Sequence, residues 1–140
     1  MADFFELEIA TPDRLLVREK AIRAQVPCMN GYIGVLPDHA ALLSELGIGA
    51  LTYVTPEDHR FSFAIKHGFV EILDNHVRIL ADDAAPGHEI DTTQAEVDLR
   101  NAQQEMLNPA IGMDIASALT AYMHAQAKID AARKHVNKEE

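Results

Sequence analysis

Seven histidines, one cysteine and many carboxylates are the side chains that could do chemistry, and their spacing matches no catalytic or metal site. Neither HxH nor HExxH occurs, and Cys28 has no second cysteine with which to hold zinc. His67 and His76 could approach one another across a hairpin. Cys28 follows Val26 and Pro27 at a strand end, without the basic neighbours that activate a thiol. We therefore expect no catalytic residue and no metal site.

Glycines recur in the segment GYIGVLPDHAALLSELGIGAL, residues 31–51, and glycine-rich loops can cradle phosphates. This segment has neither the GxGxxG nor the GxxxxGK[ST] pattern of such loops. Gly31 and Gly34 instead permit positive φ or close backbone approach, and Pro37 fixes a turn. The sequence predicts a turn-rich loop here.

The chain has 140 residues, which suits one domain of about 80 to 90 residues plus an appendage. Its charge, 12 − 22 = −10, argues against binding to nucleic acid or to an anionic lipid surface, so we expect protein partners. A single cysteine suits a reducing compartment such as the cytoplasm. No run reaches the ~20 apolar residues of a membrane span, so we expect no direct membrane insertion.

Residues 1–86 show two-residue alternation of apolar and polar side chains, which is typical of strands. The TPED sequence at 55–58 and the Asp74-Asn75 pair are hairpin turns. We expect strands to end near Leu80 and the acidic, small and breaker residues 81–87 to form a boundary. The pattern predicts a first domain that is an antiparallel β-sandwich of about eight to ten short strands.

Residues 87–140 switch to helical spacing and predict a two-helix hairpin as a second domain, with helices over about 91–107 and 113–136. Asp91 or Thr93 can cap the first helix, and Asn108-Pro109 ends it. Apolar residues recur every three or four positions, so two seams can zip together. The seams are Ala95, Leu99, Ala102 and Met106, and Ile115, Ala118, Tyr122, Ala125, Ile129, Ala132 and Val136. Because they bury little, we expect this arm to need the sandwich or a partner to stay closed.

Two stretches resemble the signature of the epsilon subunits of F-type ATP synthases, called delta in mitochondria. Residues 31–51 carry the pattern Gly-x-x-Gly-x-x-Pro-x-His, an apolar run and Leu-Gly-x-Gly. Residues 67–82, HGFVEILDNHVRILAD, carry Gly-Phe-x-Glu, a short strand and Leu-Ala-Asp. The helical hairpin also stands where the family has one, so the resemblance covers essentially the whole chain.

The resemblance implies a non-catalytic central-stalk subunit on the cytoplasmic side of the bacterial inner membrane, peripheral to it and monomeric when isolated. Its sandwich would bind the gamma subunit and the c-subunit ring, coupling their rotation to ATP synthesis. Its arm can extend toward the catalytic beta and alpha subunits and restrain ATP hydrolysis. The expected contacts are Gly31, Tyr32, Pro37, His39, Leu42, Lys128, Arg133 and Lys134. For His39 the alternative is that its ring satisfies a loop carbonyl.

Some members of the family bind ATP on the arm through the motif Ile or Leu, Asp, x, x, Arg, Ala. The matching residues here are Ile90, Asp91, Gln94 and Ala95, with Gln94 where the arginine belongs. Arginine offers a charged fork to a phosphate, whereas glutamine offers only a neutral donor. We therefore expect Asp91 to be a helix cap and the arm to bind neither ATP nor another cofactor.

Two alternatives stay open. Lys128, Arg133 and Lys134 could meet an acidic partner, but cations late in a helix also complement its dipole with no partner at all. The whole chain could instead be a free-standing β-sandwich adaptor or ligand-binding module whose helices dimerise as a coiled coil. Such a module would purify as a stable dimer, whereas a stalk subunit would be monomeric and co-purify with a membrane-bound ATPase.

Overall fold

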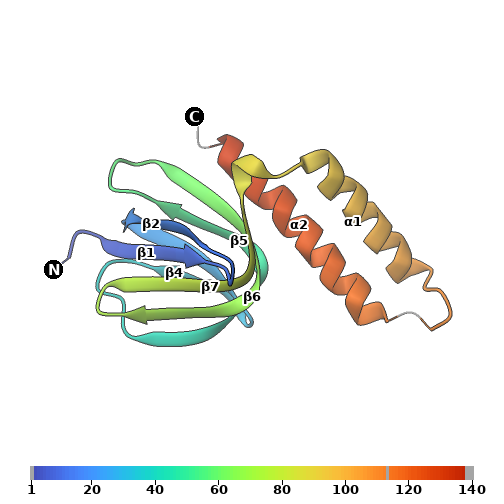
Figure 1. The fold of residues 1–140 in the computed structure, drawn as a ribbon, viewed down its shortest axis with the longest axis horizontal. Helices are drawn as coiled ribbons and strands as arrows, with labels where there is room; N and C mark the ends of the chain where they lie inside the picture. The colour runs from blue at the N-terminus through green and yellow to red at the C-terminus, as the bar shows by residue number, and fades with distance from the viewer. Residues whose placement is uncertain (1, 113, 138–140) are drawn as a thin grey trace.

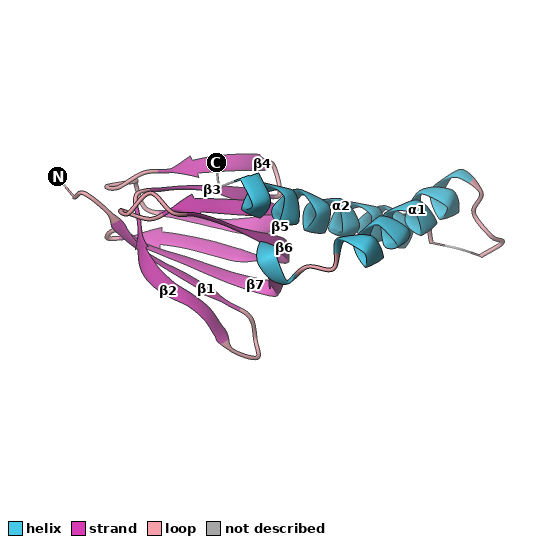
Figure 2. Ribbon diagram, turned by 90° about the horizontal axis from the view of Figure 1, so that it is seen from above, coloured by secondary structure: helices cyan, strands magenta, loops and turns pink. Residues whose placement is uncertain are grey.

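A seven-stranded sheet curled into a sandwich forms the first part of the chain, and a helical hairpin extends from one side of it (Figures 1 and 2). The computed structural model describes residues 2–112 and 114–137. The strands are β1 (Phe5–Ala10), β2 (Leu15–Ala21), β3 (Arg23–Cys28), β4 (Gly31–Val35), β5 (Leu42–Val54), β6 (Arg60–Leu73) and β7 (His76–Pro86). The helices are η1 (Gly87–Glu89), α1 (Thr92–Leu107) and α2 (Ile115–Asn137).

The predicted class, a β-sandwich followed by a two-helix hairpin, is confirmed, but the predicted number of strands is wrong. Seven strands replace the eight to ten expected, because β5, β6 and β7 run for 13, 14 and 11 residues. His67 and Gly68 take φ of 57° and 120° inside β6, while the β5–β6 register continues across them. Residues with unusual backbone therefore bend the long strands without ending them.

The expected end of strand structure near Leu80 is also wrong. β7 continues to Pro86, and its residues from Ala81 onward pair with Gly68 back to Phe63 of β6. Backbone pairing with this long neighbour outweighs the acidic and small composition of the segment. Both hairpin turns are where the sequence placed them, and Asp74 and Asn75 have φ of 51° and 61°, as a tight two-residue turn requires.

The sheet order β2-β1-β7-β6-β5-β3-β4 places the first strand inside the sheet, antiparallel to β2 and parallel to β7. Alternate residues of each strand point inward, so Phe5, Leu7 and Ile9 of β1 are almost completely buried. The same alternation supplies Leu51 and Tyr53 from β5. The core therefore lies between the two layers of one curled sheet.

The helical seams pack against each other, as the spacing predicts. Ala95 and Ala102 of α1 and Ala118, Ala125 and Ile129 of α2 are buried. Ile115, also predicted in the seam, is half exposed at the start of α2, and the side chain of Val136 lies outside the described residues. Asp91 caps α1, its carboxylate accepting a hydrogen bond from the Gln94 N–H at 3.1 Å. Because the two seams pack on each other within one chain, they are already covered and need no second copy of the chain to bury them.

A second face of α2 rests on the sheet, and we call it the alanine contact. Ala127 and Ala131 of α2 pack on Ala50 of β5 and Ala64 of β6, and all four are buried. The Ser62 hydroxyl donates to the Ala131 carbonyl at 2.5 Å. A Cβ on Gly87 would lie 2.5 Å from that carbonyl, so only glycine fits there. Small side chains thus let helix and sheet backbones approach closely.

His124 ties the same helix to β7. Its Nε2 lies 3.1 Å from the Asp83 carboxylate. Burial, assisted by the charge of Lys128, lowers the pKa of His124 against the opposing effect of Asp83. The ring is therefore a neutral hydrogen-bond donor to Asp83 at neutral pH. This hydrogen bond fixes the orientation of α2 on the sheet at the alanine contact.

Tyr32 of β4 lies across β5. The β3–β5 register shifts between Gln25 and Cys28, which interrupts the ladder beside the buried Ala50. The Tyr32 hydroxyl accepts a hydrogen bond from the Ala50 N–H at 3.0 Å. Gly49 has no side chain to collide with that hydroxyl. Tyr32 therefore satisfies a backbone donor that the sheet leaves unpaired.

We expect Ala64→Leu to loosen the hairpin, because overpacking at a tight contact costs about 1–3 kcal/mol. Amide hydrogen exchange within α2 should become faster, while exchange in the core of β1 and β7 stays slow. Ala116→Leu adds the same side chain at an exposed position of α2 and should change neither. Unchanged α2 exchange in Ala64→Leu would show that the alanine contact does not hold the arm.

Tyr32→Phe should lower the free energy of unfolding by about 1 kcal/mol, because it leaves the Ala50 N–H unpaired. Urea denaturation measures the change. The matched control is Tyr122→Phe, since the Tyr122 hydroxyl makes no hydrogen bond with the described residues. Equal stability of the wild-type and Tyr32→Phe proteins would mean that the hydroxyl has no structural role.

Candidate partner-docking site

Large apolar side chains stand exposed on the outer face of the sandwich. Leu43 is 71% exposed, and four others are about half exposed. We call this set the outer strip, and its members are Leu15, Leu43, Phe69, Leu73 and Leu80. Their immediate neighbours in the strands point inward, so the strip follows from the alternation that builds the core. A grouped apolar surface of this kind is typical of a binding face.

Strand register aligns three members of the outer strip across four strands. Phe69 of β6 lies opposite Leu80 of β7, which lies opposite Ala10 of β1, which lies opposite Leu15 of β2. Opposed residues on adjacent strands share a face. The row is therefore contiguous from β6 to β2.

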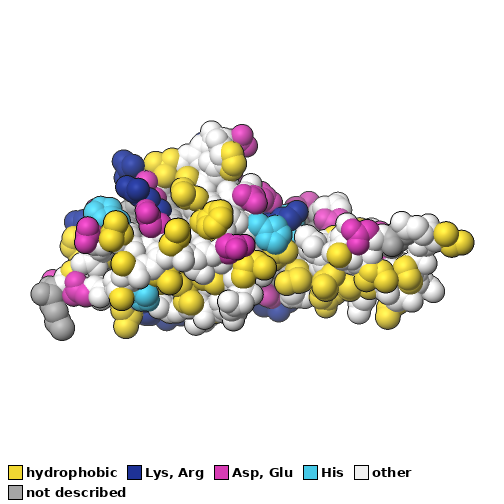
Figure 3. Space-filling model, turned by 90° about the horizontal axis from the view of Figure 1, so that it is seen from below, with side chains coloured by type: hydrophobic (Ala, Val, Ile, Leu, Met, Phe, Trp, Pro, Cys, Tyr) yellow, Lys and Arg dark blue, Asp and Glu magenta, His cyan; other side chains and the backbone are white. Residues whose placement is uncertain are grey.

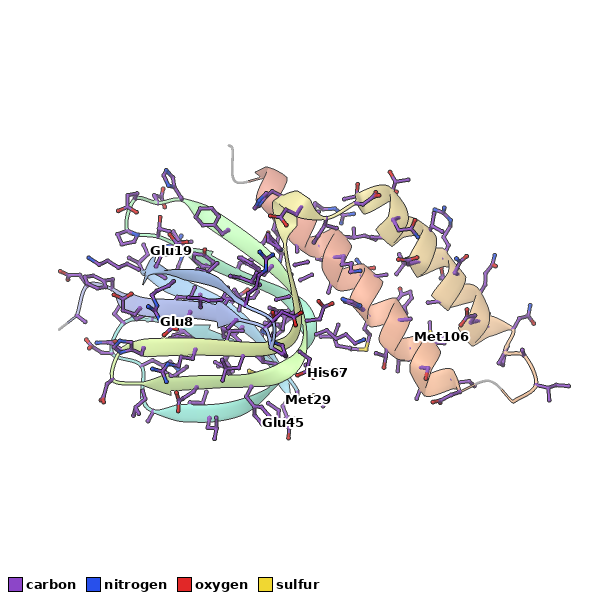
Figure 4. All side chains as sticks on the ribbon, in the orientation of Figure 1. Glu8, Glu19, Met29, Glu45, His67 and Met106 are labelled. Carbon is purple, nitrogen blue, oxygen red and sulfur yellow. The ribbon has the colours of Figure 1, made fainter. Side chains whose placement is uncertain are left out.

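A row of ion pairs runs beside the strip. Arg78 of β7 reaches Glu71 and Glu8, each at 3.5 Å, and Arg18 of β2 reaches Glu8 at 3.2 Å. Glu8 lies on β1 (Figure 4), and the strand register places it between Arg18 of β2 and Arg78 of β7. Exposed pairs of this kind each contribute at most about 1 kcal/mol to stability. Their effect is a polar border beside an apolar strip, as at many protein interfaces.

The loop after β4 is held in one shape. The Asp38 N–H donates to Asn75 Oδ1 at 2.6 Å, and Asn75 Nδ2 donates to Asp38 Oδ1 at 2.9 Å. The Ala2 N–H donates to the same carboxylate, and these bonds, that from Asn75 first, lower the pKa of Asp38. Leu36 remains 61% exposed on this loop. An ordered loop thus presents an apolar side chain at the end of the sandwich that carries the β6–β7 turn.

The structure distributes the predicted loop residues between surface and core. Gly31 has φ of 123°, Tyr32 is half exposed, and Pro37 is partly buried. His39 Nδ1 lies 2.7 Å from the Ala40 carbonyl, which is the structural role considered for it. Leu42 packs against the core, opposite Ile72, so the adjacent Leu43 carries the exposed side chain.

The three cations predicted on the second helix do not gather. Lys128 borders a hollow between the helices beside Asp98 and Glu105, while Lys134 borders a separate hollow against the sheet. Arg133 is exposed. Successive helical positions are about 100° apart, which separates neighbouring side chains around the helix. No single basic face results from these three residues.

The residues of the nucleotide motif have structural roles. Asp91 caps α1, as predicted, and Ile90 packs beside the alanine contact. Gln94 Nε2 donates to Asp98 Oδ1 at 2.8 Å, and Ala95 is buried in the seam. The side-chain amide of Gln94, which stands in place of the motif arginine, is therefore already hydrogen-bonded to Asp98.

Other candidates for chemistry are dispersed. His76 pairs with Leu73 beside the turn, whereas His67 lies next to Gly68, which pairs with Ala81. The idea that the two histidines approach each other is wrong, because they occupy opposite ends of the pairing. Burial raises the pKa of the Cys28 thiol, against a smaller effect of Ser44. Within residues 2–112 and 114–137, no three His, Cys, Asp or Glu side chains gather to hold a metal.

Sequence reasoning missed most of the outer strip. Phe69 and Leu80 lie within the second resemblance segment. Strand alternation directs them to the face away from their buried chain neighbours Val70 and Ile79. The bent edge of the sandwich was also missed, where Met29, Glu45 and His67 lie near one another (Figure 4). There the Met29 N–H donates to the Glu45 carbonyl at 3.0 Å. The β3–β5 and β5–β6 pairings together reveal that neighbourhood.

In the part of the chain that the structure describes, neither helix has the length and apolar character needed to cross a membrane. The model for the family "ATP synthase, Delta/Epsilon chain, beta-sandwich domain" matches residues 4–87. Among solved structures, a chain of the Euglena gracilis mitochondrial ATP synthase, solved with OSCP, F1 and c-ring, superposes with a TM-score of 0.82 at 21% identity. The superposition covers 95% of this chain and 83% of that chain and shows a common fold.

Curated relatives match over nearly their full length. The ATP synthase epsilon chain of Solibacter usitatus is 50% identical over 134 residues, covering 96% of this chain and 99% of the relative. That of Desulfitobacterium hafniense (strain Y51) is 39% identical over 133 residues, covering 95% and 99%. With the sandwich model spanning more than half of the sequence and relatives this similar end to end, the chain belongs to the ATP synthase delta/epsilon family as an epsilon chain.

Proposed function

We propose that the chain is a non-catalytic central-stalk subunit of an F-type ATP synthase, coupling rotation of the c-ring and gamma subunit to ATP synthesis. The end-to-end match to ATP synthase epsilon chains supports this proposal most directly. The outer strip supports it physically, because it offers a binding face without catalytic groups. Attachment through such partners would make the chain peripheral, on the cytoplasmic side of a bacterial inner membrane.

The outer strip is the surface that we assign to the gamma subunit. Its apolar row crosses several strands of a rigid sheet, and the ion-pair ladder borders it. Rigid apolar surfaces with a polar border lose little conformational entropy when they bind a partner. Strand β4 with Tyr32 and the following loop with Leu36 are the surface that we assign to the c-ring, because hydrogen bonds of Asp38 with Asn75 and Ala2 already order that loop.

The distal part of the hairpin is the surface that we assign to the catalytic beta and alpha subunits. Hydrophobic side chains gather along the hairpin in the face that Figure 3 draws. The exposed ones near its far end are Leu107, Ile111, Ile115, Leu119 and Met123. These side chains suit an apolar contact better than an acidic one, since the three cations of α2 do not share a face.

Leu80→Glu should weaken binding to the cognate gamma subunit at least tenfold, because an unpaired charge would be buried in the interface. Surface-immobilised gamma subunit measures the affinity. Leu80 is half exposed, so the variant should fold, and circular dichroism checks this. The matched control is Leu119→Glu, which places the same charge on α2 and should leave affinity unchanged. If the Leu80→Glu and wild-type proteins bind the gamma subunit with equal affinity, the outer strip is not the surface that binds it.

The arm should not bind ATP through its nucleotide motif, because Gln94 is neutral and already bonded to Asp98. In calorimetry of the isolated chain, ATP should bind no tighter than inorganic triphosphate. Gln94→Arg restores the motif and should raise the affinity for ATP, while Gln104→Arg, at an exposed position of α1, should not. Micromolar binding of ATP to the unaltered chain, in preference to triphosphate, would overturn this proposal.

A further inference from the structure

Three cations from distant parts of the sequence border one hollow of about 780 Å³ between the sheet and the last turns of α2. They are Arg23 of β3, Arg60 of β6 and Lys134 of α2. The C-terminal part of α2 lies against the sandwich, so helix and sheet form opposite sides of this hollow (Figure 1). A volume of this size is in the range of small-molecule sites.

Strand pairing places the two arginines on one face. Arg23 lies opposite Val54 of β5, and Val54 lies opposite Arg60. The neighbours Ala24, Tyr53 and Phe61 contribute to the core, so this row points outward. The backbones of Arg23 and Arg60 are then two strand spacings apart, about 9.6 Å. Ser62 is the next residue of β6 that points to this same face, and its hydroxyl donates to the Ala131 carbonyl. This hydrogen bond holds the last turns of α2, which carry Lys134, over the same area.

The three cations around the hollow are not neutralised by ion pairs within the described part of the chain. None of the three forms an ion pair with a described residue, whereas Arg18 and Arg78 do. Among the described residues that border the hollow, Asp58 is the one acid. The negative end of the α2 dipole is worth about half an elementary charge, too little to balance three cations. The described residues around the hollow therefore carry a net positive charge.

We propose that this hollow binds a condensed phosphate, a compact linear anion of the di- or triphosphate type. Guanidinium groups hold phosphate oxygens in pairs, and a chain of linked phosphates offers separate pairs of oxygens to Arg23 and Arg60 as well as more charge than one phosphate. Lys134 contributes the third charge from the helix side. The inference does not depend on the stalk role, and it concerns a different surface from the nucleotide motif at Asp91.

A bound condensed phosphate would also connect the arm to the sandwich. Arg23 and Arg60 belong to the sheet and Lys134 to α2, so the anion has all its partners only while α2 lies on the sheet. A ligand that binds one conformation better shifts the population toward it. The anion therefore holds the hairpin against the sheet.

Calorimetry with inorganic tripolyphosphate at low ionic strength tests the site on the full isolated chain. Arg23→Gln and Arg60→Gln should each raise the Kd at least tenfold, and Lys134→Gln should raise it several-fold. Arg100→Gln removes the same charge from an exposed position of α1 and should change the Kd less than twofold. Absence of binding, or equal weakening by Arg100→Gln, would overturn the proposal, because attraction would then be general rather than local.

Two further measurements define the ligand and its effect. Tripolyphosphate should slow amide exchange in the second half of α2 in the wild-type protein and not in Arg23→Gln, and unchanged exchange would refute the link between arm and sheet. An oligoglutamate of equal charge should bind at least tenfold more weakly. Equal binding of the peptide would reject a phosphate site. Gamma binding by Arg23→Gln should stay normal, which separates failure of this inference from failure of the stalk proposal.

Discussion

Close packing of alanines between α2 and the sheet determines where everything beyond Pro86 lies. Ala50 and Ala64 on the strands and Ala127 and Ala131 on the helix remove little apolar surface from water, so the contact sets position more than it adds stability. The bonds from Ser62 to Ala131 and from His124 to Asp83 give it direction. An arm held this way has a defined place but needs little free energy to leave it.

Two-residue alternation gives the strands two roles at once. Leu42 faces the core and Leu43 faces out, and the same division separates Val70 from Phe69 and Ile79 from Leu80. A shift of one residue in register would exchange the core with the outer strip. The tight Asp74-Asn75 turn and the ordered pairing of β6 with β7 prevent this. The strand register that builds the core therefore also determines which side chains form the docking face.

Local signals predicted the order of elements, both hairpin turns and the Asp91 cap, because alternation, turn residues and capping act over a few residues. The strand count failed because His67 and Gly68 bend β6 while its long-range pairing continues. Ala127 and Ala131 showed no strong apolar period, so the sheet-facing side of α2 was not predicted. The cation hollow was also hidden, since Arg23, Arg60 and Lys134 meet only through strand order and helix docking.

The parallel pairing of β1 with β7 has a consequence for how the chain is made. Ile9 lies opposite Ile79, so β1 leaves the ribosome long before β7 and cannot complete its pairing until nearly the whole sandwich has been synthesised. Contacts between such distant positions slow folding and prolong exposure of apolar strands. The N-terminal segment must therefore stay soluble while it waits, and the glutamates at positions 6 and 8 give it the charge to do so.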